Sequence, residues 1–175
     1  MLTYLLLALI LLATALLVYA STRPDVFRIE RSTSIKAPPE KLFAMINDYR
    51  NWPSWSPYEK LDPAMQRKIS GPESGKGSVY EWEGNSKVGK GRMEVLETTP
   101  PSNVTIKLDF FKPFEAHNTA VFTLKPNGGA TDVTWAMHGP APFMNKLMGV
   151  FMNFDKMVGG QFAEGLANMK AAAEK

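Results

Sequence analysis

The stretch that decides the fold is MNKLMGVFMNFDKMVGGQFAEGLANMKAA, residues 144–172, near the end of the chain. Its large apolar residues recur every three or four positions, which is the spacing of one face of an α-helix. The pattern predicts one amphipathic helix of about 30 residues. Gly159 and Gly160 lie inside it and predict a kink or the close approach of another backbone. The residues of the apolar face are Leu147, Phe151, Phe154, Val158, Phe162, Leu166 and Met169.

Upstream of this helix, short segments alternate between apolar and polar residues. Such alternation is typical of β-strands with one buried face. Turn residues separate the segments, for example Pro100-Pro101-Ser102-Asn103 and Pro126-Asn127-Gly128-Gly129, and these short turns favour an antiparallel meander. We expect strands near residues 26–36, 66–70, 78–83, 90–98, 104–110, 120–124 and 133–137.

Two short helices are expected between the first two strands. Pro38-Pro39 suits the first turn of one helix, and residues 49–57 form a second helix or turn that carries Trp52 and Trp55. The order is therefore strand, two short helices, six strands and one long helix. A single antiparallel sheet needs its apolar face covered, and only the final helix is long enough to cover it. This predicts an α+β fold in which a bent sheet wraps around the C-terminal helix.

The first 20 residues, MLTYLLLALILLATALLVYA, contain no charged side chain. As a helix of about 30 Å they match the hydrocarbon core of a bilayer. They predict a single-pass membrane anchor, and a cleaved signal peptide is the alternative because Val18-Tyr19-Ala20 resembles a cleavage site. Residues 21–25 form a polar tether, and Arg23, Arg28 and Arg31 favour a cytoplasmic position for the domain at 26–175.

Composition excludes several classes of protein. All 20 Lys and Arg and all 17 Asp and Glu follow residue 20, which leaves an ordinary soluble domain after the apolar helix. The absence of Cys excludes disulfides and a Cys-ligated zinc site. The formal net charge of +3 is spread along the chain without a basic stripe, so no nucleic-acid partner is expected.

Five segments of the chain carry a family resemblance: Ile35–Phe43, Asn51–Pro57, Gly71–Tyr80, Thr131–Trp135 and Gly165–Lys170. Together with the order of the elements, they resemble the SRPBCC superfamily, whose START-like, helix-grip members include polyketide cyclase/dehydrase and lipid transport proteins. The resemblance implies a cavity for an apolar or amphipathic small molecule between the sheet and the final helix, and it implies no particular ligand.

The candidate cavity residues are large apolar side chains on the faces that the alternation directs inward, together with one polar residue, Asn118. Trp52 and Trp55 are expected either at the mouth, because a loop usually offers two indoles little burial, or as a cap on one end of the core. For any one of these residues, the alternative is an ordinary place in the core. The candidates are Trp52, Trp55, Tyr80, Trp82, Phe110, Asn118, Phe122, Trp135, Met137, Phe151, Phe154 and Phe162.

Few polar residues suggest chemistry. Asn118 is either a ligand anchor or a structural tie, and Arg31 either pairs with an inward acid such as Glu97 or emerges near the strand end. His117 and His138 are expected on the surface, so we predict no metal site and no cofactor. No catalytic signature occurs, and Gly71–Ser78 has the wrong spacing for a phosphate loop.

Three functions remain open. The first is a membrane-tethered protein that binds a hydrophobic or lipid-like molecule in an internal cavity. The second is a polyketide cyclase or dehydratase, which requires a proton donor or acceptor in that cavity. The third is an interaction module similar to chaperone activators of the same superfamily, for which a filled core is expected. The acid/base candidates for the second function are Glu81, Glu97, Asp109 and His117.

Overall fold

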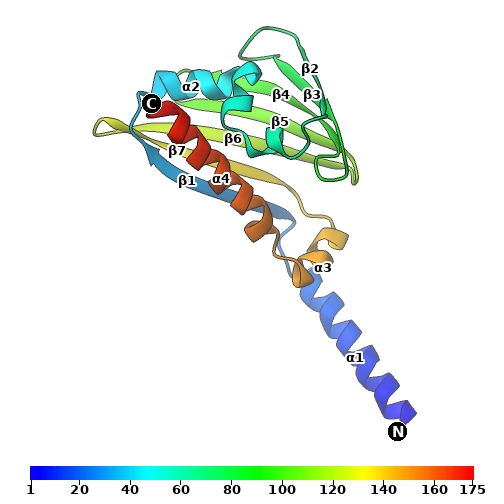
Figure 1. Cartoon of the computed structure of the whole chain (residues 1–175). Helices are drawn as coiled ribbons and strands as arrows, with labels where there is room; N and C mark the ends of the chain where they lie inside the picture. Colours follow the sequence, from blue (N-terminus) through cyan, green and yellow to red (C-terminus); the bar gives the residue numbers. More distant parts are fainter.

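The computed structural model describes residues 1–175 and places one apolar helix outside the folded domain (Figure 1). This helix, α1 (Leu2–Ser21), is the one helix that is long and apolar enough, by length and composition, to cross a membrane. Most of its side chains are exposed, but Ala20 in the last turn is buried. α1 contacts α3 (Phe143–Phe151), so its C-terminal end is joined to the domain.

The domain is built on a seven-stranded antiparallel sheet with the order β1-β7-β6-β5-β4-β3-β2. The last strand pairs with the first, and Ile29 lies opposite Met137 in that pair. All expected strands are present. Their bounds are β1 (Val26–Ile35), β2 (Gln66–Ser70), β3 (Val79–Glu83), β4 (Lys90–Thr99), β5 (Asn103–Lys112), β6 (Ala116–Asn127) and β7 (Ala130–Pro140).

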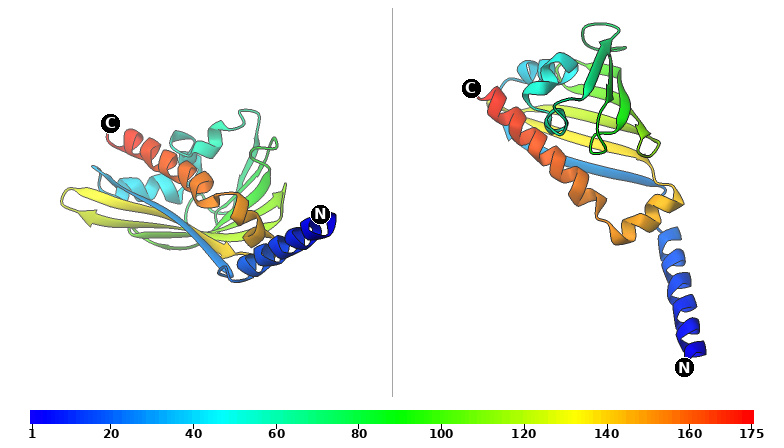
Figure 2. Two further views of the ribbon diagram at one scale, coloured as in Figure 1. Left: turned by 90° about the horizontal axis from the view of Figure 1, so that it is seen from below. Right: turned by 45° about the vertical axis from the view of Figure 1, so that its right-hand side comes forward.

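Helices cover one face of this sheet. The segment after β1 contains α2 (Pro39–Asn47) and two short 3₁₀ helices, η1 (Tyr49–Ser54) and η2 (Pro57–Lys60). The last helix, α4 (Phe154–Ala173), lies across the concave side of the bent sheet (Figure 2). The expected α+β helix-grip architecture is therefore confirmed.

The expectation of one terminal helix of about 30 residues is wrong, because the chain leaves the helical conformation at Met152. Asn153 then begins α4, and its side chain accepts a hydrogen bond from the backbone N–H of Lys156 at 2.8 Å. Asp155 adds a negative charge in the first turn, which a helix N-terminus favours. A capping signal therefore interrupts an apolar periodicity that continues on both sides of it.

Gly159 leaves room for the side chain of Arg31 where it crosses α4, since a Cβ at this position would displace the guanidinium group. Arg31 donates to the Asp155 carboxylate at 2.9 Å and to the Asp155 carbonyl at 3.0 Å. The close approach is thus made by a side chain and not by a backbone, and α4 is continuous at this point. The partner of Arg31 is Asp155, and the expected alternative, Glu97, is exposed on β4.

Aromatic rings join α4 to the sheet. Trp135 of β7 stacks on Phe162 of α4 with ring centroids 4.1 Å apart, and on Phe122 of β6 with centroids 5.0 Å apart. Gly165 lets α4 approach, because a Cβ there would lie 2.8 Å from the Trp135 ring. Phe122 is fully buried.

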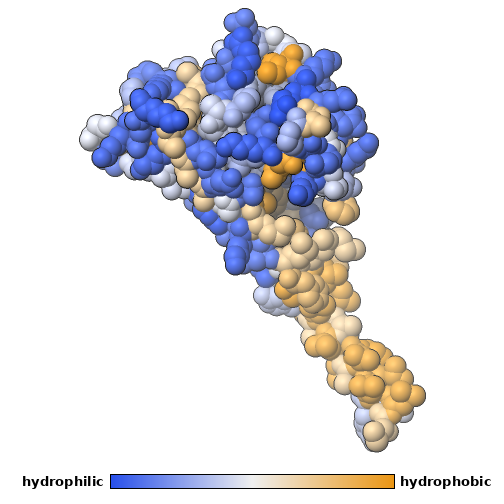
Figure 3. All heavy atoms as spheres, viewed as in Figure 1, coloured by the Kyte–Doolittle hydropathy of each residue, from blue (hydrophilic) through white to orange (hydrophobic).

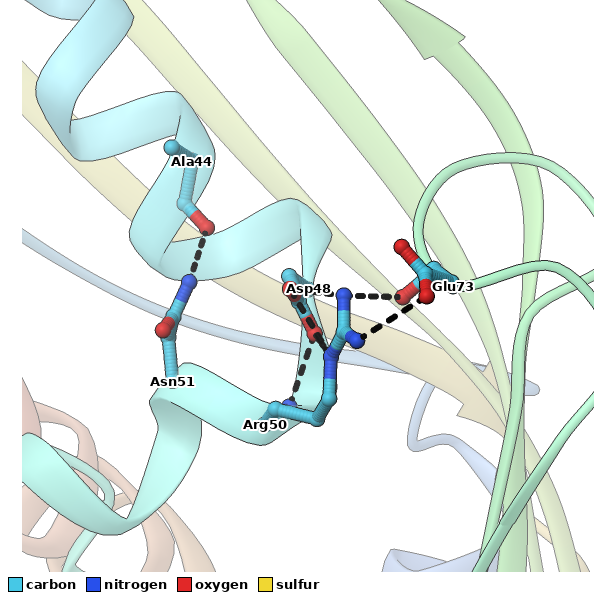
Figure 4. Close-up of polar contacts among 5 residues, drawn as sticks. All are labelled: Ala44, Asp48, Arg50, Asn51 and Glu73. Carbon is cyan, nitrogen blue, oxygen red and sulfur yellow. Dashed lines mark hydrogen bonds and ion pairs between the residues drawn. The ribbon is translucent and has the colours of Figure 1, made fainter.

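Polar contacts at its start hold η1 against α2 (Figure 4). The Asp48 carboxylate accepts from the Arg50 backbone N–H at 2.9 Å and pairs with the Arg50 guanidinium at 2.8 Å. Arg50 also reaches Glu73 at 3.5 Å, and the Asn51 amide donates to the carbonyl of Ala44 at 2.9 Å. These contacts fix the direction in which η1 presents its aromatic side chains.

We predict that Phe122→Ala lowers the free energy of unfolding by about 3–5 kcal/mol, because it removes a fully buried ring and leaves a void in the packed core. Phe110→Ala is the matched control, since Phe110 is only partly buried and lies beside open space. We expect a loss less than half as large for it. Urea unfolding of the full chain in detergent measures both, and equal losses would contradict this division between core and cavity wall.

Candidate ligand cavity

A cavity of about 960 Å³ lies between the concave face of the sheet, η2, α3 and the first half of α4. Of its 36 lining residues, 23 are hydrophobic, so a bound molecule would contact mainly apolar groups. Its volume is near the upper end of the range of about 300–1,000 Å³ that is usual for small-molecule sites.

The structure brings together ten of the twelve candidate residues as lining of this cavity. Trp55 and Phe122 do not line it, because both are fully buried in the core. Their inward register is as expected, but neighbouring side chains fill the space in front of them. The ten lining residues are Trp52, Tyr80, Trp82, Phe110, Asn118, Trp135, Met137, Phe151, Phe154 and Phe162.

Of the two expectations for Trp52 and Trp55, the position at the mouth is wrong, because both side chains are buried in the core. The indole N–H of Trp52 donates to the carbonyl of Ile46 at 2.9 Å, and that of Trp55 donates to the carbonyl of Met45 at 3.0 Å. These carbonyls belong to the last turn of α2, where the helix leaves them without partners of its own. The two indoles therefore connect η1 to α2 within the core.

Exposed residues mark the mouth at the end of the domain that carries α1. Arg23 and Pro24 of the tether line the cavity, as do several residues of α3. Phe151 at the end of α3 is 74% exposed while also lining the cavity, so its ring lies at the rim. Lys146 of α3 pairs with Asp25 at 2.5 Å and fastens α3 to the tether.

Two buried polar residues of the cavity wall, Ser56 and Glu59, are missing from the candidates. Their spacing has the pattern of a capping box, which predicts a helix start and not a ligand site. The structure does not form that box, because Ser56 makes no side-chain capping bond and the Glu59 carboxylate accepts from Tyr80 and Arg67. A capping pattern whose carboxylate is used elsewhere can be recognised only from the structure.

Asn118 lines the cavity and is nine-tenths buried. Its side chain forms no hydrogen bond with another residue, so it is not the structural tie that the sequence favours. Gly139 leaves room for it, because a Cβ on Gly139 would clash with the Asn118 side-chain oxygen. The amide therefore keeps its hydrogen-bonding capacity for a molecule in the cavity.

None of Glu81, Glu97, Asp109 and His117 lines the cavity. Asp109 and His117 are paired on the outer face of the sheet, with 2.7 Å between the carboxylate and Nδ1 of the ring. The hydrogen bond to Asp109 raises the pKa of His117 above its ordinary value. No three His, Asp or Glu side chains are grouped as a metal site would need.

His138 differs from the expected surface histidine. It is half-buried on β7, and its Nδ1 is buried without a hydrogen-bond partner. His117 is exposed, as expected.

Solved structures share this fold at low sequence identity. Protein CV1439 from Chromobacterium violaceum is 16% identical with a TM-score of 0.60, and the match covers 87% of this chain and 99% of that one. The Aha1 dimer from Colwellia psychrerythraea is 19% identical with a TM-score of 0.62, and the match covers 85% of this chain and 96% of that one. The di-domain ARO/CYC BexL from the BE-7585A biosynthetic pathway is 13% identical with a TM-score of 0.65, and the match covers 90% of this chain and 53% of that one. At these identities the similarity shows the fold alone.

Comparison with curated proteins gives no match. Residues 26–174 match the family described as Polyketide cyclase / dehydrase and lipid transport, which covers the whole domain from β1 to the end of α4. The chain therefore belongs to the polyketide cyclase/dehydrase and lipid transport family.

Proposed function

We propose that this chain is a membrane-anchored protein that binds a hydrophobic or lipid-like small molecule in the cavity between its sheet and its C-terminal helices. The observation that carries the proposal is the position of the mouth. The cavity is mainly apolar, and it opens beside the tether that joins the domain to α1. An anchor in the bilayer would hold this mouth at the membrane surface, where lipid-like ligands are concentrated.

The surface around the mouth supports this arrangement. The hydrophobic surface, coloured orange, continues from α1 onto the adjoining part of the domain (Figure 3). Phe143, Met144 and Phe151 of α3 are exposed, and so are Phe111 at the end of β5 and Phe114 in the turn between β5 and β6. That turn lies at the same end of the sheet as the start of β1. Exposed apolar groups in one region are typical of membrane or protein contact sites.

Two of the three arginines near the tether already form ion pairs within the domain, which leaves one to contact lipid headgroups. Arg28 pairs with Glu30 at 2.6 Å, and Arg31 pairs with Asp155 at 2.9 Å. Arg23 has no ion pair and lies over the Tyr19 ring at the end of α1, 5.2 Å from the ring centroid. We therefore assign the contact with anionic headgroups to Arg23, and its position after α1 favours a cytoplasmic domain.

The binding function is favoured over the two alternatives by the contents of the cavity. A cyclase or dehydratase needs a proton donor or acceptor beside its substrate, and none of the four residues expected to serve lines the cavity. The buried carboxylate that does line it, Glu59, already accepts hydrogen bonds from Tyr80 and Arg67. An interaction module needs no internal space, whereas this domain keeps about 960 Å³ of it.

We expect α1 to remain on the mature chain as an anchor. The full chain should stay in the membrane pellet after carbonate extraction, and its intact mass should include residues 2–20. The double substitution Leu9→Arg and Leu12→Arg should release the chain from the membrane, because each charge at the centre of a span costs about 2.5–3.5 kcal/mol of insertion free energy. Valine at the same two positions is the control and should leave the chain in the membrane. A mature chain that begins at Ser21 would identify a cleaved signal peptide instead.

We expect Ala120→Phe to abolish ligand uptake, because Ala120 lines the cavity at the middle of β6 and a ring there would occupy the space. Val121→Phe is the matched control, since the next side chain along the strand faces the outer side of the sheet. Uptake of a fluorescent acyl-chain probe should fall at least about tenfold in the first variant and stay unchanged in the second. Equal uptake by the two variants, or no uptake by the natural chain, would contradict the proposed function.

A further inference from the structure

Tyr80 and Glu59 are hydrogen-bonded to each other in the buried wall of the cavity, and Ser56, three residues before Glu59, lines the same cavity. We call Ser56, Glu59 and Tyr80 the inner polar group. Ser56 and Glu59 belong to the start and middle of η2, and Tyr80 belongs to β3. Their exposed fractions are 1%, 8% and 3%, and all three line the cavity. Among mainly apolar walls, such a group would fix the orientation of a bound molecule.

The charge of Glu59 is balanced from outside the cavity. Arg67 of β2 donates through Nε to Oε2 of Glu59 at 2.6 Å, and through Nη2 to the Glu59 carbonyl at 3.2 Å. Arg67 is not among the lining residues. The cavity is therefore next to a carboxylate that already has its cation and that has lone pairs left to accept further hydrogen bonds.

Tyr80 presents an acceptor to the cavity. Its hydroxyl donates to Oε1 of Glu59 at 2.5 Å, so its only proton is already used. Burial, and then the hydrogen bond to Glu59, raise the pKa of the Tyr80 hydroxyl well above its ordinary value, which keeps that proton in place. Only the oxygen lone pairs of Tyr80 remain for another group.

Ser56 supplies the one free donor of the inner polar group. Its Oγ is buried and has no hydrogen-bond partner. It occupies the N-cap position of η2 without making the capping bond that serine usually makes there. A buried hydroxyl without a partner is destabilising, so its presence in this wall calls for an explanation.

From this inventory we infer that the ligand of the cavity carries a hydroxyl group, which donates to the Glu59 or Tyr80 oxygen and accepts from Ser56. The inference rests on the proposed function and names the class of ligand as a long-chain or polycyclic alcohol. A hydroxyl can use one of the two acceptors together with the donor, because it offers one proton and two lone pairs. A carboxylate offers lone pairs only and would lie against the negative Glu59, and an ether offers no proton.

The test is a competition among four compounds with the same alkyl chain: octadecan-1-ol, octadecyl methyl ether, octadecanoate and octadecylamine. The full chain is equilibrated with an equimolar mixture in detergent micelles and repurified, and the adducts are released from it, separated by chromatography and quantified. We expect octadecan-1-ol to be the main adduct. In Ser56→Ala the ratio of alcohol to octadecylamine adducts should fall about fivefold, which is the usual effect of one hydrogen bond, because the ammonium group has no lone pair to accept from Ser56.

Ser54→Ala is the matched control, because Ser54 is an exposed serine two residues away whose hydroxyl donates to the Asn51 carbonyl. It should leave the adduct ratios unchanged. Ser56→Ala should also fold at least as stably as the natural chain, since it removes an unpaired buried hydroxyl. Glu59→Gln should lower the alcohol preference as well, with the amount of folded protein checked by circular dichroism.

The outcomes separate this inference from the proposed function. If all four compounds bind equally and Ser56→Ala changes no ratio, the hydroxyl assignment is overturned while apolar binding stands. A preference for octadecylamine or octadecanoate would overturn it as well. If the natural chain binds none of the four, the proposed function itself is overturned.

Discussion

The contact between Trp135 and Phe162 is the interaction on which the rest of the domain depends. It presses α4 against the concave face of the sheet. On one side of it, Leu166 and Met169 are buried in a solid core. On the other side, Val158 and Phe154 line the cavity, as Trp135 and Phe162 themselves do. This pair of rings is thus the boundary at which the packed interior ends and the internal space begins.

The cavity is polar in two separate places. At the mouth, charged residues form ion pairs with one another, as Lys146 does with Asp25 and Arg31 with Asp155. In the buried wall, the inner polar group keeps lone pairs and one hydroxyl proton unused. A molecule with an apolar body and one polar end fits such a division, since an unpaired polar group among buried apolar walls would be destabilising.

The strands and the closing helix could be predicted because the periods of two and 3.6 residues are sustained over whole elements. The break at Met152 escaped the prediction because apolar spacing continues across it, and the cap at Asn153 has a local effect that competes with that spacing. The burial of Trp55 and Phe122 could not be separated from cavity lining, since alternation gives the face of a strand but not what lies opposite. Ser56 and Glu59 were missed because their local pattern has a commoner structural meaning.

The break between α3 and α4 has a mechanical consequence. α3 has no buried residue, whereas α4 contributes Phe162, Leu166 and Met169 to the core. Arg31 fastens the first turn of α4 to β1. α3 is held instead by the Lys146–Asp25 pair and by its contact with α1, so the helix beside the mouth is positioned by the membrane-proximal segment and not by the packed core.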